Sequence, residues 1–527
     1  IAVSNGNFTM NNCMIINNET NNGYESTQQG GAGIFVNENS SGPETITLNN
    51  VNIDNNIINE VSTSGLGGGI YLSDNQTLIM NGGSINGNTA LYTTGSSAIY
   101  SRGGDIYLDG VTVNNNINSH TIILDANGAD TYFEAINSEI TGNDYGDAIR
   151  TIDNGAYSIS LDHVEIYNNH AGLSLNETDA NITYSRITDN GHGVFMGNSS
   201  NVSISQSTIS NNGLSVYGTG IFMVQGSTLD VTNSILYSNS YGDDDFEIGF
   251  ADAYDPNSVT VSYSNIGSVN TNDNGTIDFG DGYISVDPQF VDYDNGDYSL
   301  MASSPCINGG NPETELDADG TIADMGNSPH LNDYSGPDWY VDQVAGNDTT
   351  GTGASGSSFA TIGAALLWSD DSDTIYVGPG TYVEHLEIPH DISLIGAGLE
   401  NTIISGGNPL SEQPPLISFG QDPAALNGDI LIQGFTLRDN WAWAGAGITA
   451  SGLSSSLTLE DLVITGNTAN NDGGGILLYS TINPILNNVT LSYNTADRAG
   501  GGIAVSNGNF TMNNCMIINN ETNNGYE

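Results

Sequence analysis

Apolar and polar residues alternate along most of this chain in a short motif that recurs about every 25 residues. Two clear copies read ILIQGFTLRDN at residues 430–440 and LTLEDLVITGN at residues 457–467. In each copy apolar side chains occupy the first, third, sixth and eighth positions, and Asn closes the motif. Spacings of two residues are typical of strands with one buried face, whereas a helix needs spacings of three and four.

The break between the third and sixth positions predicts a corner, after which the chain again turns an apolar face inward. A second motif, GGGI or GAGI, recurs at residues 31–34, 67–70, 473–476 and 500–503. A unit this short cannot bury a face alone, so successive copies must stack in parallel as coils about 4.8 Å apart. The pattern therefore predicts an all-β solenoid.

The Asn that closes each copy is expected to lie at a corner of the coil. Asn tolerates left-handed backbone conformation, and its amide can bond to the Asn of the coils above and below. We interpret these residues as a structural asparagine ladder and not as separate binding sites. They are Asn18, Asn56, Asn88, Asn116, Asn143, Asn169, Asn190, Asn212, Asn239, Asn440, Asn467 and Asn494.

Two segments differ from the repeated motif. Residues 359–368, FATIGAALLW, have the spacing of an amphipathic helix, and residues 303–326 begin SSPCINGG and end DADGTIADMG. Together with the stacked GGGI and Asn-closed strands, they resemble the right-handed parallel β-helix proteins of the pectate-lyase-like superfamily, especially acidic secreted β-helix repeats of environmental microbes. The resemblance implies a right-handed parallel β-helix (solenoid) with a short N-terminal capping helix at about 359–368 and a closing segment at 303–326.

Residues 1–25 return unchanged as residues 503–527, which gives a sequence period of 502 residues. Because the predicted N-terminal cap follows the predicted C-terminal cap, we expect parts of two β-helix units. Residues 1–327 would be the later coils and C-terminal cap of one unit, and residues 338–527 the N-terminal cap and first coils of the next. Residues 328–337 would be the linker.

The formal charge of −56 at pH 7, with five basic residues in all, restricts the partners. Nucleic acid and anionic membrane surfaces require basic patches, and no apolar run is long enough to span a bilayer, so we expect neither nucleic-acid binding nor membrane insertion. Such self-repulsion instead implies saline surroundings or bound divalent cations.

The closing segment holds the best candidate for a cation. Asp317, Asp319 and Asp324 flank Gly320 in the opening pattern of a calcium loop, although the bidentate Glu of such loops is missing. We name these three residues as a candidate Ca²⁺ site, with a solvated acidic turn as the alternative.

Catalytic signals are weaker. Lyases of the superfamily use a basic residue and act on anionic glycans, and this chain has dispersed Arg residues and a strong negative charge. Residues 191–193 read GHG, as in polygalacturonase-type hydrolases, but the accompanying blocks are missing. Because His192 occupies the slot of the GGGI motif, we interpret it as a turn residue and not a catalytic one.

Trp441 and Trp443 are two positions apart and therefore share one face of a strand. Facing inward they would belong to the core, which we expect near a narrow capped end. Facing outward they would form a platform on which sugar rings stack.

We predict that the chain is not an enzyme but a structural repeat unit of an extracellular or cell-surface β-helical filament or adhesin, which assembles with itself head to tail. The identity between residues 1–25 and 503–527 favours this reading, because an enzyme gains nothing from a duplicated coil. Two alternatives remain open: a carbohydrate-active β-helix enzyme with hydrolase-like or lyase-like chemistry, and a non-catalytic module that binds extracellular polysaccharide.

Overall fold

The computed structural model confirms the predicted fold class: the chain forms right-handed parallel β-helix with little helix. The structure describes residues 1–3, 6–20, 30–36, 43–59, 66–90, 95–128, 130–152, 155–213, 220–239, 246–251, 255–269, 275–332, 334–419, 426, 428–481 and 483–523. Across this described part, no helix is both long and apolar enough to span a membrane.

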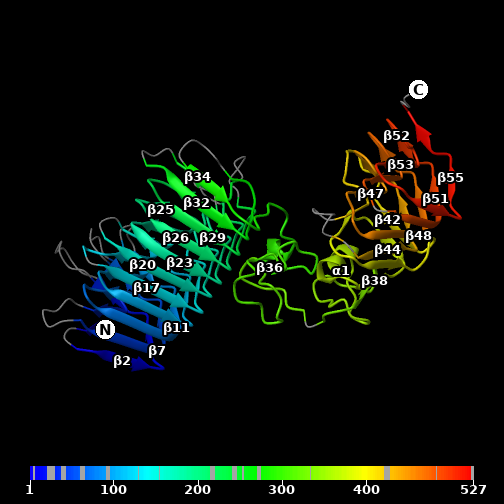
Figure 1. The fold of residues 1–527 in the computed structure, drawn as a ribbon. Coiled ribbons are helices and arrows are strands. Elements are labelled where there is room, and N and C mark those ends of the chain that lie inside the picture. The colour runs from blue at the N-terminus through cyan, green and yellow to red at the C-terminus, as the bar shows by residue number, and fades with distance from the viewer. Residues whose placement is uncertain are drawn as a thin grey trace. The chain divides into compact units, whose positions relative to one another are not determined.

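The chain divides into two compact units (Figure 1). Unit 1 comprises Ile1–Ser299 and Pro305–Pro329, and unit 2 comprises Leu300–Ser304 and His330–Glu527. The main change of unit falls within the expected linker, residues 328–337. The short segment Leu300–Ser304 belongs with unit 2, which the sequence did not indicate.

Each coil of unit 1 contributes one strand to sheet A, or two short ones in the coils of β5 and β6 and of β9 and β10, and the strands pair in parallel with their counterparts in the next coil. Its strands are β1 (Ala2–Val3), β5 (Gly30–Gly31), β6 (Ile34–Val36), β9 (Leu66–Gly67), β10 (Ile70–Leu72), β13 (Ser96–Arg102), β16 (His120–Asp125), β19 (Asp147–Thr151), β22 (Ala171–Asn176), β25 (Val194–Gly197), β28 (Ile221–Met223) and β31 (Ile248–Phe250).

In each coil sheet A is followed by sheet B, which a corner divides into two rows of parallel strands, called here the first and the second run. The first run is β2 (Phe8–Asn11), β7 (Thr45–Asp54), β11 (Thr77–Asn86), β14 (Asp105–Asp109), β17 (Thr131–Ile136), β20 (Tyr157–Asp162), β23 (Thr178–Thr183), β26 (Asn201–Ser205), β29 (Thr228–Thr232), β32 (Asn257–Ser262) and β34 (Gly275–Phe279). The second run shares β7 and β11 and adds β3 (Met14–Ile16), β15 (Thr112–Asn114), β18 (Glu139–Thr141), β21 (Glu165–Tyr167), β24 (Arg186–Thr188), β27 (Thr208–Ser210), β30 (Ile235–Tyr237) and β33 (Asn265–Ile266).

Short elements complete unit 1. After the asparagine corner lie β4 (Glu19–Thr20), β8 (Ile57–Ile58) and β12 (Thr89–Ala90). Ahead of the closing segment lie β35 (Phe290–Asp292), the 3-10 turn η1 (Tyr293–Asn295) and β36 (Asp297–Leu300).

Unit 2 repeats the coil behind a capping segment. Its elements are β37 (Asp338–Val341), α1 (Ile362–Trp368), β38 (Thr374–Val377), β39 (Gly380–Tyr382), β40 (Leu386–Ile388), β41 (Ser393–Gly396), β42 (Thr402–Ser405), β43 (Ile417–Phe419), β44 (Asp429–Gln433), β45 (Thr436–Arg438), β46 (Trp441–Ala442), β47 (Ile448–Ser451), β48 (Ser456–Thr465), β49 (Thr468–Ala469), β50 (Ile476–Tyr479), β51 (Ile485–Ser492), β52 (Thr495–Ala496), β53 (Ile503–Ser506), β54 (Thr511–Asn513), β55 (Met516–Ile518) and β56 (Glu521–Thr522).

The core is a column of apolar side chains inside the coils. In β11 the side chains of Leu78, Met80 and Ile85 are fully buried, and the register stacks Leu78 on Ile106 of the next coil. The glycines of the GGGI motif allow the coils to approach: a Cβ on Gly33 would stand 2.5 Å from the carbonyl oxygen of Gly69. No larger residue fits there without moving the backbone.

Helix α1 begins at Ile362, three residues later than predicted. Phe359 is drawn into a parallel bridge with Val341, and Thr361 then acts as the N-cap, its hydroxyl accepting the N–H of Ala364 at 3.2 Å. Glu384 accepts the backbone N–H groups of Ile362 and Gly363, so the first orphan donors of the helix are satisfied. Tertiary pairing therefore shortens the predicted helix at its N-terminal end.

The corner Asn residues of unit 1 form one continuous chain of side-chain hydrogen bonds. Each Nδ2 donates to the Oδ1 of the next coil's Asn at 2.6 to 3.2 Å, and nearly all are buried: Asn18, Asn56, Asn88, Asn116, Asn143, Asn169, Asn190, Asn212 and Asn239. The buried Glu247 ends the series by accepting from Asn239 at 2.5 Å. Sequence reasoning missed this carboxylate because it follows no Asn motif.

Unit 2 contains a second series. Asn467 donates to Asn494 at 3.1 Å, and Asn494 donates to Asn520 at 3.0 Å. Asn440 differs, since its side chain donates to the carbonyls of Pro414 and Ala446, and its backbone N–H reaches Oδ1 of Asn467.

Replacement of a buried ladder residue should destabilise unit 1 far more than replacement of an exposed one. Asn116→Ala removes the acceptor of two N–H groups of Asn88 and should cost roughly 3 kcal/mol, because those donors stay buried without a partner. Asn81→Ala is the matched control: its amide also bonds the Asn of a neighbouring coil, Asn49 at 2.8 Å, but in solvent, so we expect a cost below about 0.5 kcal/mol. Urea unfolding measures both, and equal costs would show that the buried bonds contribute nothing extra.

Candidate functional site

The outer face of sheet A carries one side chain per coil in a straight row. In each strand a buried aliphatic residue is followed by an outward one, and the register places the outward residues of successive coils side by side. We call this set the sheet A row: Phe35, Tyr71, Tyr100, Ile123, Arg150, Ser174, Phe195 and Phe222.

Aromatic rings stack on both sides of the middle of this row. The ring centroids of Tyr71 and Tyr100 lie 5.8 Å apart with an interplanar angle of 12°, and those of Phe195 and Phe222 lie 6.2 Å apart. Tyr71 and Tyr100 are buried, whereas Phe195 and Phe222 are half-buried. The accessible part of the row therefore runs from Arg150 to Phe222.

Beside the accessible part, two neighbouring coils bring polar and charged groups together. His120 begins β16 and Asp147 begins β19; His120 Nδ1 lies 3.2 Å from Asp147 Oδ2, and His120 Nε2 lies 3.1 Å from Arg150 Nη1. The Arg150 side chain is 43% exposed and that of Asp147 only 10%. The imidazole of His120 therefore contacts the buried carboxylate of Asp147 through one ring nitrogen and the accessible guanidinium of Arg150 through the other.

Both nitrogens of His120 face N–H groups. The backbone N–H of Asp147 points at Nδ1 at 2.9 Å, and the Arg150 guanidinium, which can only donate, points at Nε2. A neutral imidazole has one lone pair in the ring plane, so each of its tautomers satisfies one donor and opposes the other. In either tautomer one of the two N–H groups therefore finds no acceptor on His120.

His192 approaches the same carboxylate from the opposite direction. Its Nε2 lies 3.8 Å from Asp147 Oδ1, across a coil in which Ala171 and Gly172 leave the space open. Burial lowers the pKa of His192 below its ordinary value of 6.5, against the attraction of Asp147. Burial also opposes ionisation of Asp147, but the hydrogen bond from His120 and the charges of His120, His192 and Arg150 outweigh it, so the pKa of Asp147 is lowered.

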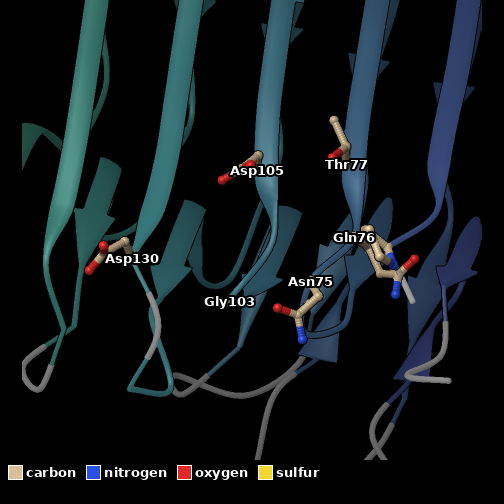
Figure 2. A pocket seen from close by; sticks show the side chains of 7 residues that line it. Asn75, Gln76, Thr77, Gly103, Asp105 and Asp130 are labelled. Atoms are coloured by element: carbon tan, nitrogen blue, oxygen red, sulfur yellow. The ribbon is translucent and has the colours of Figure 1, made fainter. Parts of the chain in front are cut away.

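A separate pocket of about 280 Å³ opens at the turns between sheets A and B. Figure 2 shows Thr77 and Asp105 at the starts of neighbouring strands, with Asp130 ahead of the next one. The pocket is lined by Pro43, Asn75, Gln76, Thr77, Gly103, Asp105 and Asp130. It offers no ring face, and Asp105 Oδ1 already accepts the backbone N–H of Tyr132 at 3.0 Å. We therefore place the candidate site on sheet A.

The three predicted calcium ligands lie in the segment that closes unit 1, where each accepts hydrogen bonds from the chain. Asp317 Oδ2 accepts the N–H of Asp324 at 2.8 Å, and Asp324 Oδ1 accepts that of Asn308 at 2.7 Å. Asp319 accepts the N–H and hydroxyl of Thr321. Within the described ranges, no group of three or more His, Cys, Asp or Glu side chains is arranged to hold a metal ion. Calcium at this turn stays a prediction.

The expectation that Trp441 and Trp443 face the core is wrong. Ala442, between them, is the fully buried residue, while Trp441 is half-buried and the Trp443 side chain is exposed. In β46 the inward position falls on Ala442, so the indoles on either side of it turn away from the core.

Sequence reasoning missed His120, Asp147 and Arg150 because no local motif joins residues in different coils. One signal was available for the aromatic part of the row: the aliphatic residue of the sheet A strand is followed directly by an aromatic one at 34–35, 70–71, 99–100, 194–195 and 221–222. That pairing marks an inward and an outward position in turn.

Comparison with known proteins agrees with the coil architecture. Residues 97–274 match the family described as right handed beta helix region. A search of curated proteins finds no match. Solved structures that resemble the chain include a pectate lyase, 15% identical over 58% of this chain and 85% of the other, with a TM-score of 0.31.

A second solved structure is an arginine-to-alanine variant of a PL6 family alginate lyase. It is 10% identical over 91% of this chain and 87% of the other, with a TM-score of 0.18. At these TM-scores the likenesses carry no argument about a site or a reaction.

The prediction that the chain is not an enzyme is nevertheless wrong as it was made. The solved structures that it matches are enzymes, a pectate lyase and an alginate lyase. The exclusion of lyase chemistry also looked for the base only among Lys and Arg, whereas the fold brings Arg150 to an imidazole, that of His120, and to Asp147.

His192 should make unit 1 less stable as the pH falls below about 6.5. The unfolded chain takes up a proton there at the ordinary pKa of His, while the folded chain, whose His192 pKa is lowered, does not, so protonation favours unfolding. His192→Gln should flatten the fall in unfolding free energy between neutral and mildly acidic pH. Asn81→Ala, which removes an exposed amide and no titratable group, is the control and should leave the slope unchanged. Identical slopes for wild type and His192→Gln, from urea unfolding at a series of pH values, would contradict the assignment.

Proposed function

We propose that unit 1 is a carbohydrate-active β-helix that cleaves a neutral polysaccharide along the outer face of sheet A. The single observation that carries the proposal is that Arg150, His120 and Asp147 meet where the accessible part of the sheet A row begins, two coils before the stacked pair of Phe195 and Phe222.

The aromatic part of the row suits sugar rings. Phe195 and Phe222 are half-buried in neighbouring coils and stack on each other, so their outward edges form an apolar strip against which the apolar faces of pyranose rings pack. From Arg150 to Phe222 the row crosses three coil steps, about 14 Å, which leaves room for a short run of sugar residues. A glycan lying along the coil axis would pass directly over Arg150.

The acid–base part supplies proton transfer. As water attacks the anomeric carbon and the glycosidic C–O bond breaks, His120 takes a proton from that water. The departing oxygen, on the opposite side of the carbon, takes a proton from solvent, and His120 then returns its own to solvent, so the reaction consumes no net proton. Asp147, held ionised, stabilises the imidazolium that forms in between, and Arg150 donates hydrogen bonds to sugar oxygens from its exposed position.

The charge of the chain favours a neutral glycan over an anionic one. With −56 formal charges, the approach of a polyuronate is opposed at long range, and Arg150 is already paired with Asp147 at 3.6 Å. A neutral polysaccharide meets no such barrier.

The purified chain should release reducing ends from at least one soluble neutral glycan, such as a glucan, mannan or xylan. His120→Gln should lower the rate by roughly 100-fold or more, because it removes the group that transfers the proton. Asp147→Asn should lower it strongly as well, since the imidazolium loses its counter-charge. Reducing-end assays measure the rates of the wild-type chain, His120→Gln and Asp147→Asn over a panel of glycans that also contains polygalacturonate and alginate.

The control for these variants is His163→Gln, which breaks the exposed pair of His163 with Asp162 at 3.0 Å and should keep full activity. Melting curves establish that each variant is folded. Release of unsaturated ends from polygalacturonate or alginate alone, or full activity in His120→Gln, would refute the proposal.

The duplicated segment favours a second candidate function, that of a repeat unit in an extracellular or cell-surface filament that associates head to tail. Its two copies form the same coil: β2, β3 and β4 in one, and β54, β55 and β56 in the other, with Asn12 and Asn514 both at positive φ. The same coil recurs once in unit 1 and once in unit 2, as expected if near-identical units follow one another in an array.

For this second function we expect mass to increase with protein concentration in sedimentation experiments, and rods in negative-stain micrographs. Non-closing head-to-tail contacts generate such filaments. Discrete monomers at every concentration, with and without millimolar Ca²⁺, would rule it out without bearing on the proposed activity.

A further inference from the structure

Unit 2 presents an aromatic surface that is separate from sheet A. Trp441 and Trp443 both leave the core on either side of the buried Ala442, and the Trp443 residue is 60% exposed. Trp441 lies in β46, and Trp443 lies in the bend that follows that strand. We call these two residues the Trp platform.

Hydrogen bonds hold one of the two rings in place. Trp441 Nε1 donates to Asn470 Oδ1 at 2.8 Å, and Asn470 Nδ2 donates to Glu412 Oε2 at 2.7 Å. The three residues come from three successive coils, since Gln413 bridges to Ala442 and Trp441 pairs with Thr468. A ring fixed in this way loses little conformational entropy when a ligand stacks on it.

The groups around the Trp platform are polar and carry no uncompensated positive charge. Gly445, two residues after Trp443, donates its N–H to the carbonyl of Asp472, whose carboxylate accepts two hydrogen bonds from Arg498. Glu412 adds a negative charge beside Trp441. Amide and carboxylate groups next to exposed indoles match the hydroxyl edges and apolar faces of a sugar, whereas an anionic glycan would meet repulsion.

We propose that the Trp platform is a non-catalytic binding site for a neutral glycan. Trp443 stacks on a sugar ring, Trp441 provides a second, pre-oriented face, and Asn470 and Glu412 bond to hydroxyl groups. The site stands on unit 2 residues alone and does not depend on the activity proposed for unit 1.

The four Trp residues of the chain allow a direct test. Trp339 and Trp368 are buried in unit 2, so ligand-induced changes in tryptophan fluorescence report on Trp441 and Trp443. Titration with cellohexaose and mannohexaose should give a saturable change with at least one of them and none with an alginate oligosaccharide. The bound sugar should also protect Trp443 from oxidation by N-bromosuccinimide.

Trp443→Ala should weaken binding roughly tenfold or more, as expected for the loss of one stacked ring, while Tyr479→Ala should leave it unchanged. Tyr479 is the matched control because it is an exposed aromatic residue, 46% accessible, on another sheet of unit 2. Affinity gel electrophoresis in neutral polysaccharide measures both variants without using fluorescence.

Three results would overturn the proposal: no response to either neutral oligosaccharide, a response to alginate alone, or binding that survives in Trp443→Ala. Because the readout reports on unit 2, it can fail while the reducing-end assay of unit 1 succeeds, and the reverse also holds.

Discussion

Every coil of this chain depends on its neighbours, because the backbone N–H and C=O groups of a parallel coil find their partners only in the coils above and below. The corner amides follow the same rule: each ladder Asn is satisfied by the next one, from Asn18 to Asn239, until Glu247 takes the place of the next acceptor. Buried donors without partners are costly, so the coils must stay in register. This requirement gives the fold its regularity and makes its outer rows straight.

Straight outer rows convert residues far apart in sequence into neighbours about 4.8 Å apart. His120, Asp147 and His192 lie in different coils, yet their side chains meet because the coil that separates the last two offers only Ala171 and Gly172 at that place. The Trp platform arises in the same way from Glu412, Trp441 and Asn470. A β-helix can therefore assemble a site without any irregular loop, provided that single coils depart from the repeat.

The charge of the chain sets the background for both sites. Because the chain has few basic residues, the place of each Arg decides where a positive charge is available. Arg150 lies on the sheet A row beside the imidazole of His120, whereas Arg498 is paired with Asp472. Both surfaces accordingly suit uncharged, hydroxyl-rich ligands better than polyanions.

Much of the fold could be predicted because its determinants are local. Alternating apolar residues, closing Asn residues and glycines at close approaches act within a few residues, so the coils, the asparagine ladder and a capping helix near 359–368 were predicted from the sequence alone. The left-handed backbone expected of the ladder Asn residues falls instead on the residue before each, such as Asn17, Asn55 and Asn115. The start of that helix was not, because the pairing of Phe359 with Val341 is a contact between distant segments. The direction in which Trp443 faces, and the meeting of His120, Asp147 and Arg150, were decided by tertiary structure. Which outward residues become neighbours depends on loop lengths and on register shifts such as the one between Ser96 and Ile99, and neither leaves a local pattern in the sequence.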